Sequence, residues 1–329
     1  MILISIIIPT YNRKLLLEAA VESSITQSCR AIEIIVVDDG STDGTDRMME
    51  SNLKGKWGEH NIQYVVQKNA GACVARNKGL ALAKGDYVQF LDSDDELLPN
   101  KLEKQLELLE RPGNESIKMC YCYGRMGESK DEDYQRIGVQ TASVDELLLH
   151  LVSRTTHVMQ TSAALWRRSF LAEGEGWRQE MGFGDDLEYS VRLVARLDAF
   201  AFIDEEYFLV RVHSANRLSA DTMTRDSLHC AMRTQQSIYR TLCDSGYRNN
   251  ATMHAFVGAV RIVYANSLQY GTIDDIERFE DWLTSVGASD PAFRALNRLI
   301  SARRILGAKF LMCVHEMIMK LRRRFRQGS

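Results

Sequence analysis

Three aspartates within four residues, Asp92, Asp94 and Asp95, directly follow an apolar run that is typical of a buried strand. Carboxylates this close repel one another unless a cation or strong hydrogen-bond donors lie among them. Oxygen ligands suit Mg²⁺ or Mn²⁺, which proteins usually hold with one or two carboxylates and the phosphates of a substrate. Such an ion would neutralise charge on a departing diphosphate. The same triplet also occurs in solvated turns that cap helices, so by itself it indicates little.

A second acidic pair, Asp185 and Asp186, begins a helical pattern that runs to Leu197. Acidic residues stabilise the first turn of a helix through its dipole, which is a sufficient reason for the pair. A carboxylate in a site can also take the proton of an attacking hydroxyl group. The pair therefore has two interpretations, a helix cap and a general base.

The elements that must position these residues follow from the apolar pattern. Residues 1–100 alternate short β-branched runs with longer helical patterns, which predicts a mostly parallel sheet covered by helices. The predicted strands are residues 4–8, 34–37, 62–66 and 87–91. Helices are predicted at residues 15–28 and 70–83. Gly85 is expected to close the helix at 70–83 as a left-handed cap.

Polar side chains follow three of these strands where each strand ends. They belong to Tyr11 and Asn12, to the pair Asp38 and Asp39, and to residues 92–95. Ligands of open α/β sheets collect outside the carboxyl ends of the strands. We therefore expect one edge of the sheet to combine hydroxyl, amide and carboxylate groups.

Four segments, residues 5–13, 36–43, 69–79 and 92–95, stand in an order that resembles the nucleotide-binding half of family 2 glycosyltransferases. The resemblance is dense over residues 4–100 and thinner to about 215. Each motif alone is modest, but four in this order and spacing are highly specific. The resemblance implies a GT-A fold, which is a Rossmann-like α/β domain with a mostly parallel central sheet flanked by helices.

The resemblance also implies roles in binding the nucleotide. Pro9 and Tyr11 match positions that line the base pocket, and Asp39 matches the carboxylate that hydrogen-bonds the base, usually uracil. Arg76 matches a basic residue near the nucleotide and its diphosphate. The residue types agree, since a tyrosine ring can stack on a base and a guanidinium can pair with phosphate oxygens.

The metal and the general base are implied in the same way. Asp92 and Asp94 match the DxD motif, the first near the ribose and the second on a divalent metal, Mn²⁺ or Mg²⁺. His213 follows a predicted strand and matches a frequent third metal ligand. Asp186 matches the general base, and Asp185 stands where the motif more often has Glu. A single in-line attack would invert the anomeric carbon.

The remaining chain predicts the domain organisation. Strands are expected near 118–123 and 208–212 and a helix at 185–197, whereas only helical patterns follow residue 220. We expect a GT-A domain over residues 1–218 and a helical region over 219–329 that could form a homodimer interface. Within the first, residues 1–100 would bind the nucleotide and residues 101–218 would supply the acceptor and catalytic half. The C-terminal helices are expected at 223–244, 250–268, 273–285 and 292–325.

Residues 298–326 form a basic amphipathic tail with nine Lys or Arg and one Glu, while the whole chain has a net charge of −3. Such a helix can lie on an anionic membrane surface, or it can pack its apolar face on the enzyme. The apolar N-terminal run stops at Pro9, which does not fit a signal peptide. The seven cysteines contain no CxxC pair and suit a reducing compartment. We expect a cytoplasmic protein, peripheral on the inner face of the plasma membrane if the tail binds it.

The sequence and the resemblance together predict an inverting transferase that moves a sugar from a nucleotide-diphosphate sugar to an acceptor hydroxyl. A UDP-sugar is the expected donor, and bacterial surface polysaccharide or lipid-linked glycan synthesis is the expected pathway. A sugar nucleotidyltransferase would need a glycine-rich basic loop after the first strand, and an oxidoreductase would need G-x-G-x-x-G there; residues 9–12 supply neither. A sugar-nucleotide-binding module without turnover stays open, although Asp92, Asp94 and Asp186 weigh against it. Nucleic acid is not expected as a partner, because the basic residues cluster in one tail.

Overall fold

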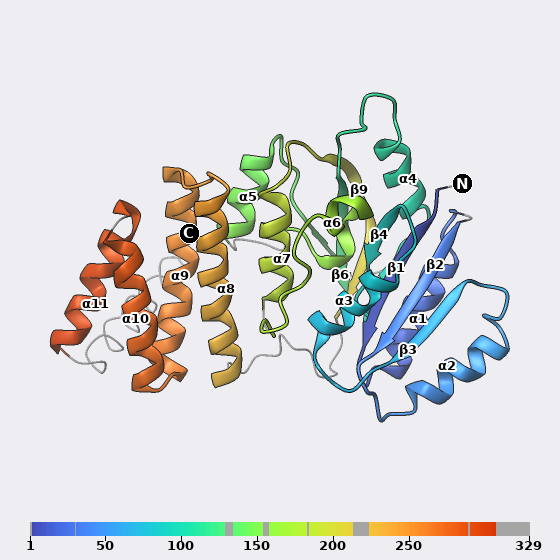
Figure 1. Cartoon of the computed structure of the whole chain (residues 1–329), viewed down its shortest axis with the longest axis horizontal. Coiled ribbons are helices and arrows are strands. Elements are labelled where there is room, and N and C mark those ends of the chain that lie inside the picture. The colour runs from blue at the N-terminus through green and yellow to red at the C-terminus, as the bar shows by residue number, and fades with distance from the viewer. Residues whose placement is uncertain are drawn as a thin grey trace. The chain divides into compact units, whose positions relative to one another are not determined.

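A computed structural model describes residues 2–29, 31–128, 134–153, 158–182, 184–212, 224–288 and 290–306. The chain divides into two compact units, Met1–Arg217 and Leu218–Ser329. The first unit is α/β and the second is helical (Figure 1), which confirms the predicted fold class.

The first unit contains a sheet whose strands are β1 (Ile4–Thr10), β2 (Ile32–Asp38), β3 (Ile62–Val66), β4 (Tyr87–Phe90), β5 (Asp95–Leu97), β6 (Met119–Gly127), β7 (Gln135–Ile137), β8 (Leu165–Arg167) and β9 (Ala201–Arg211). Their order is β3-β2-β1-β4-β8-β6-β9-β5, and β7 pairs with β6. Strands β1 to β4 are mutually parallel, β8 runs against both β4 and β6, and β9 is parallel to β6. The carboxyl ends of β1, β2, β4 and β9 therefore lie at the same edge.

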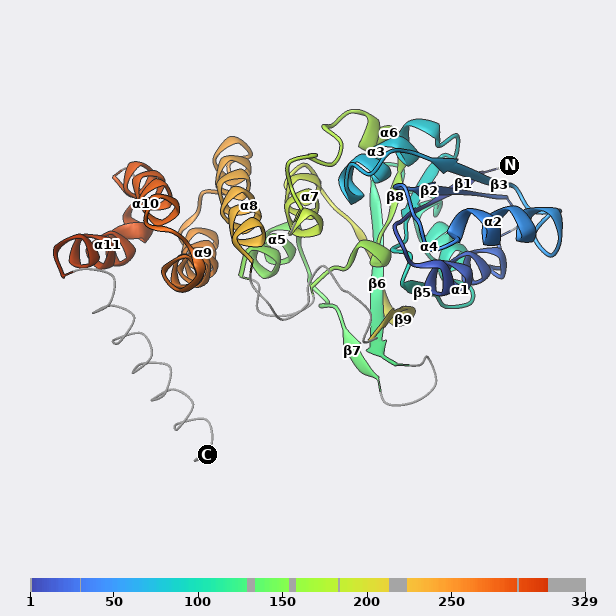
Figure 2. The same ribbon diagram turned by 90° about the horizontal axis from the view of Figure 1, so that it is seen from below.

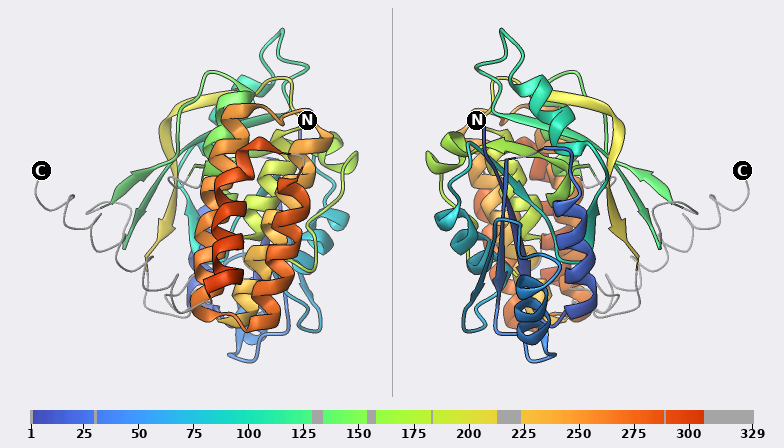
Figure 3. Two further views of the ribbon diagram at one scale, coloured as in Figure 1. Left: turned by 90° about the vertical axis from the view of Figure 1, so that its left-hand side faces the viewer. Right: turned by 90° about the vertical axis from the view of Figure 1, so that its right-hand side faces the viewer.

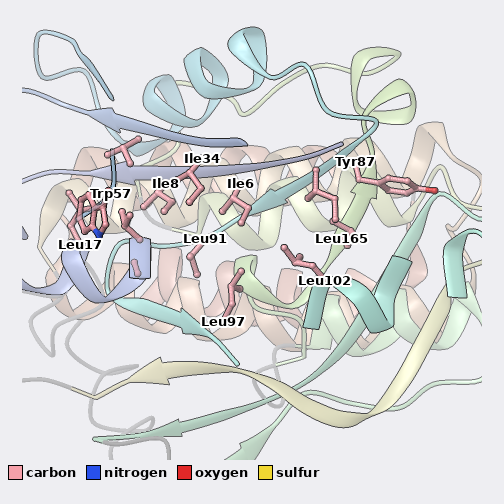
Figure 4. Packing of buried hydrophobic residues seen from close by; sticks show 14 of the residues in the cluster. Ile6, Ile8, Leu17, Ile34, Trp57, Tyr87, Leu91, Leu97, Leu102 and Leu165 are labelled. Atoms are coloured by element: carbon pink, nitrogen blue, oxygen red, sulfur yellow. The ribbon is translucent and has the colours of Figure 1, made fainter. Parts of the chain in front are cut away.

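Helices cover both faces of this sheet, as Figure 2 shows from below. The helices of the first unit are α1 (Lys14–Ile25), α2 (Thr45–Lys54), α3 (Ala72–Leu82), α4 (Lys101–Leu109), α5 (Val144–Ser153), α6 (Arg168–Ala172) and α7 (Asp185–Val194). Ile6 and Ile8 of β1 point into a core with Leu17 of α1 and Leu102 of α4 (Figure 4). The intervening Ile7 faces α3 instead. Every residue of β1 is buried, as expected for a strand covered on both faces.

Two glycines allow α3 and the turn after it to approach β1 closely. A Cβ atom on Gly79 would lie 2.3 Å from Cγ2 of Ile7. The prediction that Gly85 is a left-handed cap is wrong, because α3 ends at Ala83 in an extended conformation and Gly85 has no positive φ. Its glycine is required by space, since a Cβ there would lie 2.6 Å from the backbone nitrogen of Ser5.

The second unit is built from α8 (Arg225–Asp244), α9 (Asn250–Tyr270), α10 (Ile273–Gly287) and α11 (Arg294–Leu306), which lie side by side (Figure 3). Thr224 and Thr272 close capping boxes at the starts of α8 and α10. Within the described residues of either unit, no helix is both long and apolar enough to cross a membrane.

A buried carboxylate joins three of these helices. Glu280 of α10 is fully buried and accepts hydrogen bonds from the Tyr264 hydroxyl at 2.5 Å, Arg303 Nη2 at 2.7 Å and Arg304 Nε at 3.1 Å. Arg303 and Arg304 belong to the basic segment 298–326, so this part of the segment packs on the helical unit. Residues 307–326, the rest of that segment and of the helix predicted at 292–325, lie outside the described residues.

Candidate active site

The structure brings Arg76, Asp92 and Asp185 together at the carboxyl edge of the sheet. Arg76 lies on α3, Asp92 follows β4, and Asp185 begins α7. Arg76 Nη2 lies 2.7 Å from Asp92 Oδ1, and Arg76 Nη1 lies 2.7 Å from Asp185 Oδ2. The guanidinium group also stacks on Trp177, 4.4 Å from the ring centroid. One cation therefore links the acidic motif after β4 to the acidic pair of α7.

Arg76 is 6% exposed. Burial on its own lowers the pKa of a guanidinium, but the facing carboxylates Asp92 and Asp185 outweigh this and raise the pKa of Arg76. Its Nε atom is buried without a hydrogen-bond partner in the structure. Arg76 is thus a positive charge that its surroundings hold in place.

Asp94 lies on the other side of the same turn and forms an ion pair with Arg13, the residue that precedes α1. The backbone oxygen of Asp94 accepts a 3.0 Å hydrogen bond from Nε of Arg211, at the end of β9. Arg211 Nη2 also donates to the Leu16 carbonyl at 3.0 Å. Arg211 thereby ties the ends of β9 and of the β4–β5 turn to the first turn of α1.

Asp95 turns away from this site. It lies in β5, is 5% exposed, and accepts a 2.8 Å hydrogen bond from the Ser162 hydroxyl. The three neighbouring aspartates therefore have separate donors, namely Arg76 for Asp92, Arg13 for Asp94 and Ser162 for Asp95. This separation explains how the chain holds three carboxylates within four residues.

Asp186 is the second residue of α7 and is partly buried. Burial and the adjacent charge of Asp185 raise the pKa of Asp186 to about 6. Its Oδ1 atom accepts a 2.7 Å hydrogen bond from the Leu187 backbone, which opposes the rise without cancelling it. A carboxylate with a pKa near the operating pH is suited to act as a general base.

Asp39 holds the loop between β3 and α3. Its side chain, 4% exposed, accepts hydrogen bonds of 2.8 Å from the backbone nitrogens of Ala70 and Gly71 and from Nε2 of Gln67. A carboxylate offers about four acceptor positions, so about one is left for a donor on a ligand. Asp39 therefore also fixes the conformation of this loop, a role that the sequence did not indicate.

Pro9 and Tyr11 lie at the end of β1. The carbonyl oxygen of Ile7 accepts a hydrogen bond from the backbone nitrogen of Leu91, which follows β4. Backbone groups alternate in direction along a strand, so those of Pro9, two residues later, also face the β4 side. The pairing with β4 ends at Ile7, so the missing N–H of Pro9 leaves no ladder bond unmade. Tyr11 is 47% exposed, which leaves a ring face available for stacking.

The site offers oxygen ligands for a divalent metal. Asp92 is 33% exposed and Asp94 is 13% exposed as side chains. Within the described ranges, no group of three His, Cys, Asp or Glu residues is placed to hold a metal. His213 lies outside the described residues. Two carboxylates fit Mn²⁺ or Mg²⁺ when substrate phosphates complete the coordination.

Several residues at this site had no predicted role. Asn77 of α3 holds the Trp177 backbone through two hydrogen bonds, 2.6 Å to its carbonyl and 2.7 Å from its nitrogen. This contact places the indole under Arg76. Asn77 and Arg13 lie within the motifs at residues 69–79 and 5–13, and this position was the one indication in the sequence that they belong to the site. Trp177 and Arg211 carry no such signal, because tertiary packing alone brings them to the site.

Comparison with known proteins places this geometry in context. The sequence model of "Glycosyl transferase family 2" matches residues 5–174, more than half of the chain. A Bacillus subtilis protein named "Putative teichuronic acid biosynthesis glycosyltransferase TuaG" is 46% identical over 107 residues, 32% of this chain and 42% of its own length. The uncharacterised glycosyltransferase YibD of Escherichia coli is 35% identical over 164 residues, 47% of this chain and 46% of its own. The chain thus spans less than half of these relatives.

Solved structures share the fold over a longer stretch. A crystal structure of S. aureus TarS in complex with UDP-GlcNAc has a TM-score of 0.70 at 17% identity, covering 99% of this chain and 92% of the other. The mannosyltransferase PcManGT from Pyrobaculum calidifontis, in complex with GDP-Man and Mn²⁺, has a TM-score of 0.52 at 17% identity, covering 94% and 83%. At these identities the likeness concerns the fold, and it agrees with the predicted GT-A type.

Proposed function

The chain belongs to glycosyl transferase family 2, and we propose that it transfers a sugar from a UDP-sugar to an acceptor hydroxyl with inversion of the anomeric carbon. The observation that carries this proposal is the bridge by which Arg76 joins Asp92 to Asp185, next to Asp186. The bridge sets a fixed cation and a raised-pKa carboxylate at one strand edge. A diphosphate leaving group and an attacking hydroxyl need these two groups.

The donor would bind across the ends of β1, β2 and β4. Tyr11 would stack on the base, Pro9 would line the base pocket, and the remaining acceptor position of Asp39 would take a base N–H. Asp92 would contact the ribose, and Arg76 would supply a fixed positive charge beside the diphosphate. TarS has been crystallised with UDP-GlcNAc, which favours uracil over guanine as the base.

Asp94 and His213 would hold Mn²⁺ or Mg²⁺ together with the diphosphate. When bound, such an ion offsets the negative charge that grows on the departing diphosphate. The residues themselves support this assignment electrostatically. Four carboxylates and two guanidinium groups leave a net charge of −2 here, which matches one divalent cation; they belong to Asp92, Asp94, Asp185, Asp186, Arg13 and Arg76.

Asp186 would act as the general base. It would take the proton of the acceptor hydroxyl while that oxygen bonds to the anomeric carbon and the bond from this carbon to the diphosphate breaks. The nucleoside diphosphate leaves from the opposite face, which inverts the carbon. With its pKa raised to about 6, Asp186 is a stronger base than an ordinary aspartate and is still mostly ionised at neutral pH.

The acceptor in this proposal is a surface or lipid-linked glycan, supported by the teichuronic acid assignment of the relative TuaG. Arg303 and Arg304, at the start of the basic tail 298–326, form ion pairs with Glu280. The proposed contact with an anionic inner membrane surface therefore involves only residues 307–326 of this tail. Cosedimentation with anionic liposomes should fall when residues 307–329 are deleted. Unchanged cosedimentation would remove the membrane from the proposal.

The direct test is release of nucleoside diphosphate from a panel of UDP-sugars and GDP-mannose, with Mn²⁺ and a mixture of glycan acceptors. Acceptor-dependent release of UDP is expected, together with a mass increase of one sugar on the acceptor. Release of GDP alone would overturn the uracil assignment. Tight UDP-sugar binding without transfer to any acceptor would favour a binding module.

A further inference from the structure

Arg13 occupies the carboxylate that the proposed function assigns to the metal. Its Nη1 atom forms an ion pair with Oδ2 of Asp94, and the two side chains are 20% and 13% exposed. A guanidinium group and a divalent cation compete for the same carboxylate oxygens, because both need contact distance to them. The Arg13–Asp94 ion pair can therefore exist only while no metal is bound to this oxygen of Asp94.

The loop that carries Arg13 is fixed by the neighbouring loop after β2. The Asn12 nitrogen donates to Ser41 Oγ at 2.9 Å, and the Thr42 nitrogen donates to Asn12 Oδ1 at 2.7 Å. One residue further on, the Lys14 nitrogen donates to Asp43 Oδ2 at 2.9 Å. These bonds flank Arg13 on both sides and hold its backbone in place.

Asp94 is fixed from the other direction, because Arg211 holds its backbone oxygen at 3.0 Å. With both backbones fixed, the Arg13–Asp94 contact can open only by rotation of the side chains. The Arg13 side chain is 20% exposed and so lies nearer to solvent than that of Arg76, which is 7% exposed between two carboxylates and the Trp177 ring.

We propose that Arg13 takes the place of the metal on Asp94 while the donor is absent, and gives Asp94 up when the metal and the diphosphate bind together. This inference rests on the proposed function, because it takes Asp94 as a metal ligand. Arg13 lowers the affinity of the site for the metal alone. The diphosphate restores that affinity, since it supplies oxygen ligands to the metal and an anion to the released guanidinium. Arg13 is thus a source of coupling between metal and donor.

The test is a titration with Mn²⁺, in which electron paramagnetic resonance measures the free ion, with and without UDP. Arg13→Gln is expected to bind Mn²⁺ without UDP on the order of tenfold more tightly than the wild type, a typical size for a coupling between sites. The ratio of the Mn²⁺ affinities with and without UDP should shrink accordingly. A purely structural Arg13 would leave the affinity for Mn²⁺ alone unchanged or weaken it.

Lys54→Gln is the matched control, because it removes the same charge from an exposed ion pair with Glu50 on α2. It should titrate like the wild type. Adding Asp94→Asn to Arg13→Gln should abolish the gain. If Arg13→Gln does not fold, Arg13→Lys replaces it and should give a smaller gain in the same direction, since an ammonium group keeps the charge but is more strongly hydrated than a guanidinium group.

The outcomes separate the two proposals. If UDP raises the Mn²⁺ affinity of the wild type but Arg13→Gln binds Mn²⁺ alone no more tightly, the role of Arg13 is refuted and the donor site stands. If UDP leaves the Mn²⁺ affinity of the wild type unchanged, the donor site is wrong, and the inference about Arg13 fails with it.

Discussion

The two units each contain an arginine–carboxylate network, and the two networks are built differently. In the helical unit, Glu280 is fully buried and is met by a tyrosine and two arginines. At the strand edge of the α/β unit, Arg76 is buried instead, and it is shared by Asp92 and Asp185, whose side chains are 33% and 18% exposed. Cations satisfy the first network, whereas carboxylates outnumber cations in the second.

Under the proposed function, this difference separates a structural network from one that binds a ligand. A carboxylate whose acceptor positions are filled stabilises the contact between its helices and has no capacity left for chemistry. Burial, and after it the repulsion between neighbouring carboxylates at a partly open edge, raises the pKa of Asp186, and a bound cation would offset the repulsion. Substitutions in the two networks should therefore change different properties, activity in one and stability in the other.

The largest effect is expected for Asp186→Asn. An amide cannot take the acceptor proton, so kcat should fall by about 10²–10⁴-fold while the affinity for UDP changes little. Steady-state transfer assays and calorimetric UDP titration measure the two quantities. Full turnover by this variant would show that another group is the base.

The same variant should be more stable than the wild type at neutral pH. The folded pKa of Asp186, about 6, lies above its ordinary 3.8, so the native state holds this proton more tightly than the unfolded chain. The ionised carboxylate therefore costs stability increasingly as pH rises from about 4 to 6. Allowing for partial exposure, Asp186→Asn should gain about 1–2 kcal/mol at pH 7 and nothing below pH 4. Urea unfolding at several pH values measures this, and a loss at pH 7 would contradict the raised pKa.

Glu280→Gln should give the next largest effect, on stability alone. It leaves Arg303, 8% exposed, without its counter-charge, and the free energy of unfolding should fall by about 3–5 kcal/mol. Denaturant unfolding followed by circular dichroism measures this loss. A comparable loss in kcat/KM at a temperature where the variant is folded would show that the helical unit takes part in catalysis.

Asn77→Ala tests how the strand-edge network is positioned. Loss of both hydrogen bonds to the Trp177 backbone should lower the free energy of unfolding by about 1–3 kcal/mol. Because Trp177 supports Arg76, KM for the donor should rise more than kcat falls. Lys78→Ala serves as the control, because Lys78 is the next residue of α3, is only partly buried, and donates to the Val66 carbonyl instead of to the Trp177 backbone. Equal kinetics in the two variants would mean that Trp177 does not position Arg76.

The smallest effect is expected for Arg304→Gln. The Arg304 side chain is 43% exposed. When Arg304 is replaced, Glu280 still accepts hydrogen bonds from Arg303 and Tyr264. The expected loss of stability is under about 1 kcal/mol. A loss as large as that of Glu280→Gln, in the same denaturant experiment, would show that both arginines are needed to satisfy the buried charge.

The sequence predicted the parts of the fold that depend on local patterns. β3 lies at the predicted residues 62–66, and the polar groups after β1, β2 and β4 do meet at one edge. β8 was missed because it has three residues and is defined by its partners β4 and β6. β9 was predicted only from residue 208, because three acidic residues at 204–206 interrupt its apolar pattern and its register with β6 is irregular.

The candidate site was predictable to a similar degree. The motifs indicated Arg76, Asp92 and Asp186, but not that one guanidinium would bridge two of the acidic segments. Salt bridges such as Arg13–Asp94 depend on side chains brought together by the sheet topology, and spacing in sequence does not specify them. Residues at such contacts are therefore identified only from the three-dimensional structure.

The most direct test of the donor site is thermal unfolding of the protein with UDP, in the presence and absence of Mn²⁺, for the wild type and Asp94→Ala. At about 100 times its dissociation constant, UDP should stabilise the wild type by roughly 2.7 kcal/mol when Mn²⁺ is present. Without Mn²⁺, or in Asp94→Ala, most of this shift should disappear. A UDP shift of equal size in Asp94→Ala, or none in the wild type with Mn²⁺, would contradict a metal-dependent donor site at this strand edge.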